Sequence, residues 1–284
     1  MDPGSRKRKA SPARPQEDRN KMAKNKKKWI TTRKDVAEAR AIHPGDVGIW
    51  ATCAMKKEAP SVSDLRDLFQ EYASKIYEVD HPDGTAEDRE TEGEVDIEAE
   101  IAKEVSEIRK PGVEPLFTSV RLDTQCLIFF KTRKPVEPVS FVHQICKDAA
   151  NGVERKRCRF VKRLTPISAI DKATERGLEI VAQQVLAPHF HGIEQAGKKF
   201  AIRTSIRNHT ELTRDDLIKK VAAAVGPGHT VDLSGYELLI LVEIYKNILG
   251  MSVVGADFDK LKRYNLAELP GATQPDLKDA PASS

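Results

Sequence analysis

The segment GKKFAIRTSIRNH, residues 197–209, carries the pattern that decides the fold of the second half of the chain. Side chains of an extended strand alternate between two faces. One face of this segment would hold the apolar residues Phe200, Ile202 and Ile206. The opposite face would hold Arg203, Ser205 and Arg207. We therefore predict a strand that covers a core on one side and presents two guanidinium groups on the other.

Helical periodicity flanks this strand on both sides. A helix is expected over residues 171–186, ended by Pro188. A second helix is expected to start at Thr213 and Asp216 and to stop at Gly226. The inward positions of the two helices are Leu178, Val181, Val185, Leu186, Leu217, Val221, Ala224 and Val225.

Two apolar strands close the second half, ELLILVEIY from Glu237 and ILGMSVVG from Ile248, with a turn at residues 246–247 between them. The first is apolar on both faces, as is typical of a central strand. Glu243 interrupts it, and a buried carboxylate needs a partner. Arg203 and Lys246 are the expected partners, and a structural ion pair is the simplest account.

The first half of the chain predicts a smaller α+β unit. The expected elements are strand 47–55, helix 62–77, strands 117–122 and 126–131 joined as a hairpin through Asp123 and Thr124, and helix 139–149. Ser61 and Asp64 are spaced like a capping box. The inward positions are Leu65, Leu68, Phe69, Tyr72, Ile76, Val142, Ile145 and Ala149. This order of elements, closed by a strand, predicts a ferredoxin-like fold.

Charge is segregated along the chain, although the formal net charge is only +4. Residues 1–34 carry 13 basic and three acidic residues, and residues 81–110 carry 11 acidic and four basic residues. Segments this polar bury too little apolar surface to offset the entropy of ordering. The predicted organisation is a disordered basic arm at 1–43, an N-terminal domain at 44–154 with a flexible acidic insertion at 81–112, a second domain at 155–266 and a disordered tail at 267–284.

The basic arm bears on location. RKRK at residues 6–9 and KNKKK at residues 24–28 resemble the halves of a bipartite nuclear import signal, and a solvated tail that attracts RNA is the alternative. No stretch reaches the roughly 18 apolar residues of a membrane helix, and we expect no membrane association. The four cysteines form no CxxC pair and are expected to be reduced. The nucleus, in particular the nucleolus, is the expected location, with the cytoplasm as the alternative.

Signatures of common catalysts are missing from the sequence. No GxxxxGK[ST] loop, no GxGxxG after a strand, no HExxH and no GxSxG occurs. We therefore expect no catalytic residue, no cofactor and no small-molecule substrate. His189 and His191 in PHFHG lack a matching cysteine or carboxylate cluster, so we expect no metal site either.

Two dense groups of cations remain. The first comprises Arg155, Lys156, Arg157, Arg159, Lys162 and Arg163, and the second comprises Lys198, Lys199, Arg203, Arg207, Asn208 and His209. Each group alone is also compatible with the solvated face of a half-buried sheet. Together they favour a surface that follows phosphates. The nearby aromatic residues Phe160 and Phe200 are expected to point inward, which favours recognition of folded RNA by shape over base stacking.

The segments RFVKRLTPIS, FAIRTSIRNH, VEIYKNILGMSVV and KRYNLAEL, in this order of elements, resemble a THUMP domain. More closely, they resemble the eukaryotic family of THUMP proteins that assist tRNA acetylation. The resemblance covers residues 47–266 and is most specific in the second half.

The resemblance implies a ferredoxin-like domain followed by a THUMP domain that binds structured RNA, chiefly tRNA. It implies that an RNA cytidine acetyltransferase is the partner and performs the catalysis that forms N4-acetylcytidine. The family's RNA-facing positions fall here on Arg159, Lys162, Arg163, Lys198, Lys199, Arg203, Arg207 and Lys246.

A non-catalytic tRNA adaptor is therefore the leading hypothesis for function. The alternatives are a THUMP-containing enzyme that modifies tRNA on its own, and a protein-interaction scaffold that does not touch RNA. The missing nucleotide-binding signatures argue against the enzyme. Charge reversal at Arg203 and Arg207 would leave a pure scaffold functional.

Overall fold

The computed structural model describes residues 41–78, 115–120, 122–152, 158–192 and 195–269. Most of the predicted basic arm, the acidic insertion and most of the C-terminal tail lie outside these residues, as do Arg155, Lys156 and Arg157. The described residues from Ile42 to Leu269 belong to one compact unit. Within the described residues, no helix is both long and apolar enough to cross a membrane.

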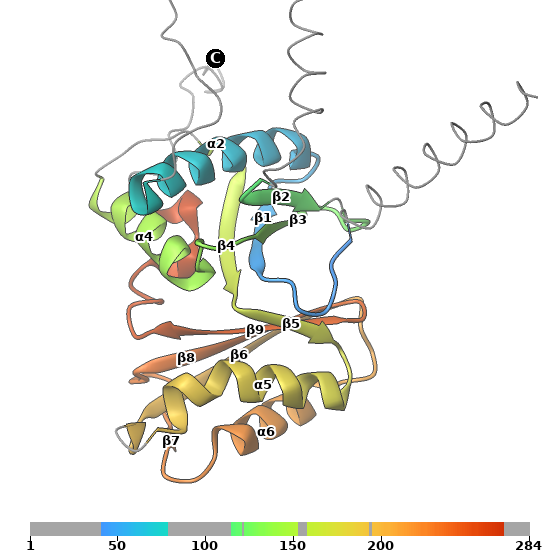
Figure 1. Ribbon diagram of the computed structural model, residues 1–284, viewed down its shortest axis with the longest axis vertical. Coiled ribbons are helices and arrows are strands. Elements are labelled where there is room, and N and C mark those ends of the chain that lie inside the picture. Colours follow the sequence, from blue (N-terminus) through green and yellow to red (C-terminus); the bar gives the residue numbers. More distant parts are fainter. Residues whose placement is uncertain (1–40, 79–114, 121, 153–157, 193–194, 270–284) are drawn as a thin grey trace, which may run out of the picture. The chain divides into compact units, whose positions relative to one another are not determined.

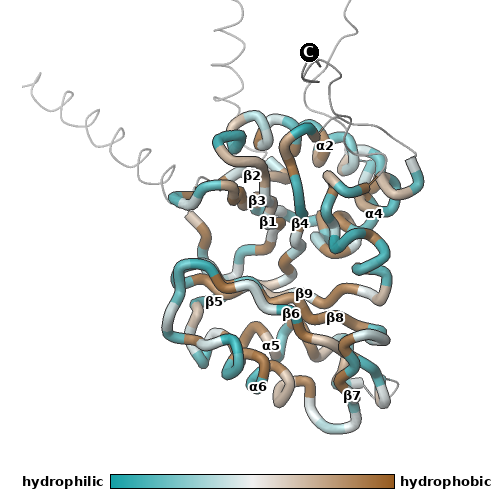
Figure 2. Tube along the Cα trace, turned by 180° about the vertical axis from the view of Figure 1, so that it is seen from behind, coloured by the Kyte–Doolittle hydropathy of each residue, from teal (hydrophilic) through white to brown (hydrophobic). Residues whose placement is uncertain are grey.

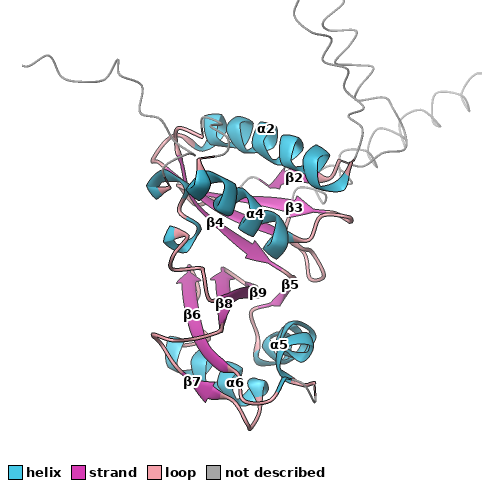
Figure 3. Cartoon of the chain, turned by 90° about the vertical axis from the view of Figure 1, so that its left-hand side faces the viewer, coloured by secondary structure: helices cyan, strands magenta, loops and turns pink. Residues whose placement is uncertain are grey.

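The first sheet is antiparallel and has two helices on one face (Figures 1 and 3). Its elements are β1 (Gly48–Cys53), α2 (Glu58–Tyr77), β2 (Phe117–Val120), β3 (Leu127–Thr132), α4 (Pro138–Asn151) and β4 (Val161–Ile167). The strands lie in the order β2-β3-β1-β4. The predicted hairpin is confirmed, because Phe117 faces Thr132 and Val120 faces Phe129 in antiparallel register.

Helix α2 differs from its prediction at both ends. It begins at Glu58 rather than at residue 62, and Lys57 precedes it without a side-chain capping bond. The expected capping role of Ser61 is therefore wrong, since this serine is fully buried inside the helix. Ile76 was expected to point inward but is 39% exposed. The other inward positions of α2 and those of α4 are buried as predicted.

The second sheet is mixed and carries α5 and α6 on one face (Figure 1). Its elements are β5 (Ala169–Lys172), α5 (Glu175–Phe190), β6 (Lys199–Arg207), α6 (Arg214–Val225), β7 (Thr230–Val231), β8 (Leu238–Tyr245) and β9 (Ile248–Gly255), in the strand order β5-β9-β8-β6-β7. Two short 3-10 helices follow, η2 (Lys262–Tyr264) and η3 (Leu266–Glu268). Strand β6 runs parallel to β8 and β7, whereas β9 is antiparallel to β8 and β5.

The helices of the second half confirm one predicted boundary and correct another. Thr213 caps α6 by accepting a hydrogen bond from the Asp216 amide, and Gly226 ends it as predicted. Helix α5 was predicted over residues 171–186 but starts at Glu175, because Thr174 caps it and residues 169–172 form β5. Pro188 does not end α5 but lies in its last turn, where the helix lacks one amide donor and continues only to Phe190.

Strand β4 connects the two sheets. Residues 161–167 were predicted to open the second domain, yet they pair with β1 at the edge of the first sheet. The chain then continues from β4 into β5 of the second sheet (Figure 1). Between these strands the Ser168 amide donates to the Met251 carbonyl at 3.0 Å. Ser252 fixes the same crossing through its hydroxyl, which donates to the Pro166 carbonyl at 2.6 Å.

The second sheet is buried on both faces. One face packs on α5 and α6 through residues such as Phe200, Ile240 and Val242. The other face contributes Leu239 and Leu241 to a core shared with the first sheet. Figure 2 shows the resulting hydrophobic stretches along β8 and β9. The predicted central position of β8 is confirmed.

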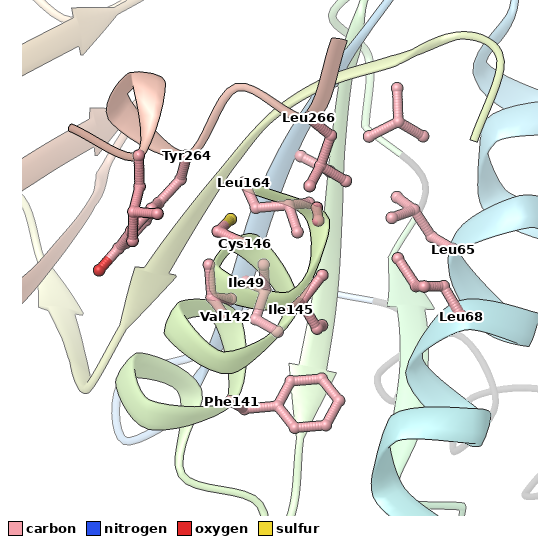
Figure 4. Packing of buried hydrophobic residues seen from close by; sticks show 14 of the residues in the cluster. Ile49, Leu65, Leu68, Phe141, Val142, Ile145, Cys146, Leu164, Tyr264 and Leu266 are labelled. Atoms are coloured by element: carbon pink, nitrogen blue, oxygen red, sulfur yellow. The ribbon is translucent and has the colours of Figure 1, made fainter. Parts of the chain in front are cut away.

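The segment after β9 returns to the core of the first sheet. Its buried side chains are Phe258, Leu261, Tyr264, Leu266 and Leu269. In Figure 4, Tyr264 and Leu266 lie beside the core residues that point inward from β1, β4, α2 and α4. The C-terminal segment therefore ties the two sheets together through apolar burial.

Gly48 offers a direct test of the packing between β1 and β3. A Cβ atom at this position would collide with the Phe130 carbonyl oxygen and lie 2.6 Å from Cζ of Phe129. We expect Gly48→Ala to lower the free energy of unfolding by about 1–3 kcal/mol, measured by urea unfolding. At Gly255 the nearest atom would be 3.4 Å away, so Gly255→Ala serves as the control. Equal effects of the two substitutions would contradict the packing of Gly48.

Candidate RNA interface

Strand β6 has the two faces that its sequence predicts. Phe200 is buried among the residues facing α5 and α6, and Ile202 and Ile206 are half-buried against the same core. On the opposite face the side chains of Arg203 and Arg207 are 39% and 34% exposed. The prediction of an apolar face and a cationic face is confirmed.

Arg203 is held by the segment that follows β9. Its guanidinium lies 5.4 Å from the centre of the Phe258 ring, and its Nη1 lies 3.6 Å from Oδ1 of Asp259. The same carboxylate accepts hydrogen bonds from the Tyr236 hydroxyl at 2.6 Å and from Nε of Arg263 at 2.9 Å. The hydrogen bond from Tyr236, with further help from the two arginines, lowers the pKa of Asp259. A charged Asp259 therefore joins Arg203 to Arg263.

Arg207 pairs with Glu243, which corrects the expected partner of this carboxylate. Its Nη1 donates to Oε2 of Glu243 at 2.9 Å. The parallel register places Ser205 beside Glu243, so Arg207, two residues further along the same face, reaches Glu243 diagonally. The two residues expected to pair with Glu243 bind other carboxylates, Arg203 to Asp259 and Lys246 to Asp123.

Glu243 is the most deeply placed charge of this face, and only 13% of its side chain is exposed. Burial raises its pKa, whereas Arg207, the hydrogen bond with Ser205 and the charge of Arg163 act in the opposite direction. Arg163 comes from β4, so this carboxylate senses guanidinium groups from both sheets.

The structure thus brings together four arginines and two carboxylates, which we name the arginine cluster: Arg163, Arg203, Arg207, Arg263, Asp259 and Glu243. Arg163 belongs to the first predicted cation group, and Arg203 and Arg207 belong to the second. Arg263 was missed, because it lies in an irregular turn where neither helical nor strand periodicity assigns a face. Its sequence signals were the basic pair at residues 262–263 and its place in the segment KRYNLAEL.

Three other predicted RNA-facing lysines lie near the ends of β6 and β8. Lys198 approaches Glu237 at 3.6 Å and Lys199 approaches Asp232 at 3.3 Å. Lys246 lies in the turn between β8 and β9 and approaches Asp123 at 2.9 Å. Each lysine therefore has an acidic partner at the surface, where such pairs contribute little stability.

The turn at Lys246 touches the loop between β2 and β3. Thr124 in that loop donates to the Tyr245 hydroxyl at 3.2 Å and accepts from the Asn208 side chain at 3.1 Å. Lys246 and Asn208 therefore contribute to the contact between the two sheets.

The first predicted group is divided among different neighbours. Lys162 and Arg163 are both exposed, and they lie at a shift in register between β1 and β4, where simple alternation of strand faces does not apply. Lys162 acts electrostatically on Cys53, whereas Arg163 acts on Glu243. Arg159 is exposed before β4 and interacts with Asp64. Phe160 is only half-buried and lies 4.7 Å below the ammonium of Lys57, so its expected inward orientation is only partly met.

The described residues contain no group of three or more His, Cys, Asp or Glu side chains that could hold a metal ion. His191 instead contacts the Ala224 carbonyl at 2.9 Å. Burial lowers the pKa of His189 at the end of α5.

The raised pKa of Glu243 predicts a pH dependence of stability. Its usual value is 4.5, and the folded protein binds the proton more tightly than the unfolded chain does. The stability contributed by this proton is complete below that value and is lost as the pH rises through the folded pKa. The glutamine in Glu243→Gln does not titrate, so this variant does not lose stability at that position as the pH rises. We therefore expect the free energy of unfolding of Glu243→Gln, relative to that of the wild type, to increase from pH 4.5 to neutrality. Urea unfolding at several pH values measures this difference. A difference that does not change with pH would contradict the assignment.

Comparison with known proteins places this chain in a family. Residues 172–254 match the THUMP domain model. The chain is 36% identical over 229 residues to an uncharacterized protein of Schizosaccharomyces pombe, covering 80% of this chain and 77% of that protein. It is 35% identical over 254 residues to the Saccharomyces cerevisiae protein named tRNA acetyltransferase TAN1, covering 80% and 86%. It is 31% identical over 255 residues to THUMP domain-containing protein 1 of Bos taurus, covering 87% and 68%. The chain therefore belongs to the family of THUMP-domain proteins that includes TAN1 and THUMP domain-containing protein 1.

Proposed function

We propose that this protein is a non-catalytic adaptor that binds tRNA and presents it to an RNA cytidine acetyltransferase, which forms N4-acetylcytidine. The arginine cluster is the observation that carries the proposal. Within the part of the chain that the structure describes, the cluster as defined holds four guanidinium groups and two carboxylates, so it has an excess of positive charge. The THUMP match and the name of the yeast relative indicate tRNA and acetylation as the context.

Guanidinium groups suit this task because their planar donors match phosphate oxygens in pairs. Each phosphate contact that releases a counterion contributes a slope of about 0.7 to 0.9 log units of affinity per log unit of salt. Binding through several arginines would therefore be useful but sensitive to salt. Holding the tRNA in one orientation would accelerate the partner by positioning the reacting cytidine.

We infer that the first sheet and its two helices form a ferredoxin-like domain in the adaptor. The strand order β2-β3-β1-β4 and the order of helices and strands along the chain support this assignment. Through Arg163 this domain would contribute to the same RNA surface as the THUMP domain. We also propose a nuclear, in particular nucleolar, location on the basis of residues 6–9 and 24–28, which lie outside the described residues.

A stand-alone enzyme is the second candidate, favoured by the word acetyltransferase in the name of the yeast relative. It predicts acetylation by this chain alone in the presence of tRNA and an acetyl donor. An adaptor predicts no product until the partner enzyme is added.

Reconstituted tRNA acetylation tests the adaptor. We expect this protein to increase product formation by the partner, and Arg203→Glu or Arg207→Glu to weaken tRNA binding roughly 10- to 100-fold, because each loses a charge-assisted contact. Binding is measured by fluorescence anisotropy with a tRNA transcript, and product by nucleoside analysis.

Lys219→Glu is the matched control, since it reverses an exposed charge on α6, across the sheet from the arginine cluster. Circular dichroism would verify that each variant is folded. If both arginine variants supported acetylation as well as the native chain, the assigned RNA face would be wrong.

A further inference from the structure

We propose that Arg263 is a further RNA-contact residue, presented beside Arg203 by a left-handed turn and held there by Asp259. This inference rests on the proposed tRNA binding and adds a residue that the sequence did not identify. Its partner chemistry is the phosphate backbone of a folded RNA.

The turn that carries Arg263 has an unusual backbone. Lys262, Arg263 and Tyr264 have φ angles of 52°, 58° and 57°, so three consecutive residues other than glycine are left-handed. Such residues normally occur singly, because Cβ then approaches the following carbonyl at a cost of roughly 1–2 kcal/mol per residue. A run of three persists only where the surroundings determine the conformation.

The contacts of Tyr264 and Asn265 hold the turn in this conformation. Tyr264 is fully buried, and its ring packs edge-on against Phe258 at 4.8 Å between ring centres. Asn265 forms an antiparallel bridge with Arg163 of β4. Inside the turn, the Arg263 amide donates to the Phe258 carbonyl at 2.8 Å. With Tyr264 fixed inside, the residues before it, Lys262 and Arg263, are left at the surface.

The side chain of Arg263 is oriented at one end only. Its Nε donates to Oδ1 of Asp259, and Nη1 of Arg203 approaches the same oxygen. Among the described residues, no hydrogen bond is found to the terminal nitrogens of Arg263, and 57% of its side chain is exposed. The guanidinium groups of Arg203 and Arg263, which are distant in sequence, thus both lie next to Oδ1 of Asp259. The terminal nitrogens of Arg263 remain as donors for a ligand.

This arrangement favours an anion with several oxygens. One carboxylate neutralises one of the two positive charges, so the Arg203 and Arg263 pair retains a net charge of about +1. An arginine preoriented by Asp259 loses less conformational entropy when it binds than a freely moving side chain would lose. Phosphate offers oxygens that can accept from both guanidinium groups, and Arg163 beside Asn265 would extend the same surface toward β4.

The test measures binding of a tRNA transcript by the full chain at several salt concentrations. We expect Arg263→Ala to weaken binding about 5- to 30-fold and to reduce the slope of log affinity against log salt by about 0.7 to 0.9. Arg263→Lys retains the charge without the planar donors, so it should recover the slope but not the full affinity. Arg176→Ala on α5, an exposed arginine across the sheet, should match the wild type.

Three outcomes would overturn the proposal, and thermal unfolding of each variant ensures that they concern folded protein. Equal affinity and slope for Arg263→Ala and Arg176→Ala would show that Arg263 does not contact RNA. Unchanged tRNA binding with a loss of acetyltransferase stimulation would assign Arg263 to a protein interface instead. If the wild type itself did not bind tRNA, the proposed function would fail together with this inference.

Discussion

Burial of the second sheet on both faces is the constraint on which the rest of this structure depends. Helices α5 and α6 cover one face, and the first sheet and the C-terminal segment cover part of the other. On this second face, charged side chains can reach solvent only beyond the area that the first sheet and the C-terminal segment bury. Along β6, Ala201 is buried in the shared core, whereas Arg203 and Arg207 on the same face are partly exposed. The arginine cluster therefore lies where the first sheet and the C-terminal segment no longer bury this face of the second sheet.

The C-terminal segment, which follows β9, helps to bury the second sheet and also contacts the arginine cluster. Phe258 and Tyr264 are buried with the first sheet, and Phe258 and the adjacent Asp259 contact Arg203. Apolar burial of this segment, at about 25 cal/mol per Å², therefore offsets the cost of a left-handed turn. The same packing that joins the two sheets also determines which guanidinium groups meet. Stability and the geometry of the candidate interface are thus coupled through one short segment.

The sequence predicted most helices and strands correctly, but it did not predict all of the strand pairings or the ion pair of Glu243. Alternation along residues 197–209 identified both faces of β6, because strand parity depends only on local geometry. The cap at Thr213 and the stop at Gly226 were found for the same reason. By contrast, the pairing of β4 with β1 depends on contacts distant in sequence. The partner of Glu243 was wrong because it depends on the parallel register of β6 and β8, which no local pattern encodes.

The two carboxylates of the arginine cluster partly neutralise its arginines, and this affects how the cluster would bind an anion. Arg207 is paired with Glu243, and Asp259 lies between Arg203 and Arg263, so a phosphate must compete with a carboxylate or bind to the remaining donors. In the proposed complex with RNA, such competition would lower affinity, but it would also fix the side chains before RNA binds. In the proposed adaptor role, the protein would have to release its tRNA after each modification. A surface whose cations are partly neutralised in advance binds reversibly, whereas four unpaired arginines would bind more tightly and with less discrimination among nucleic acids.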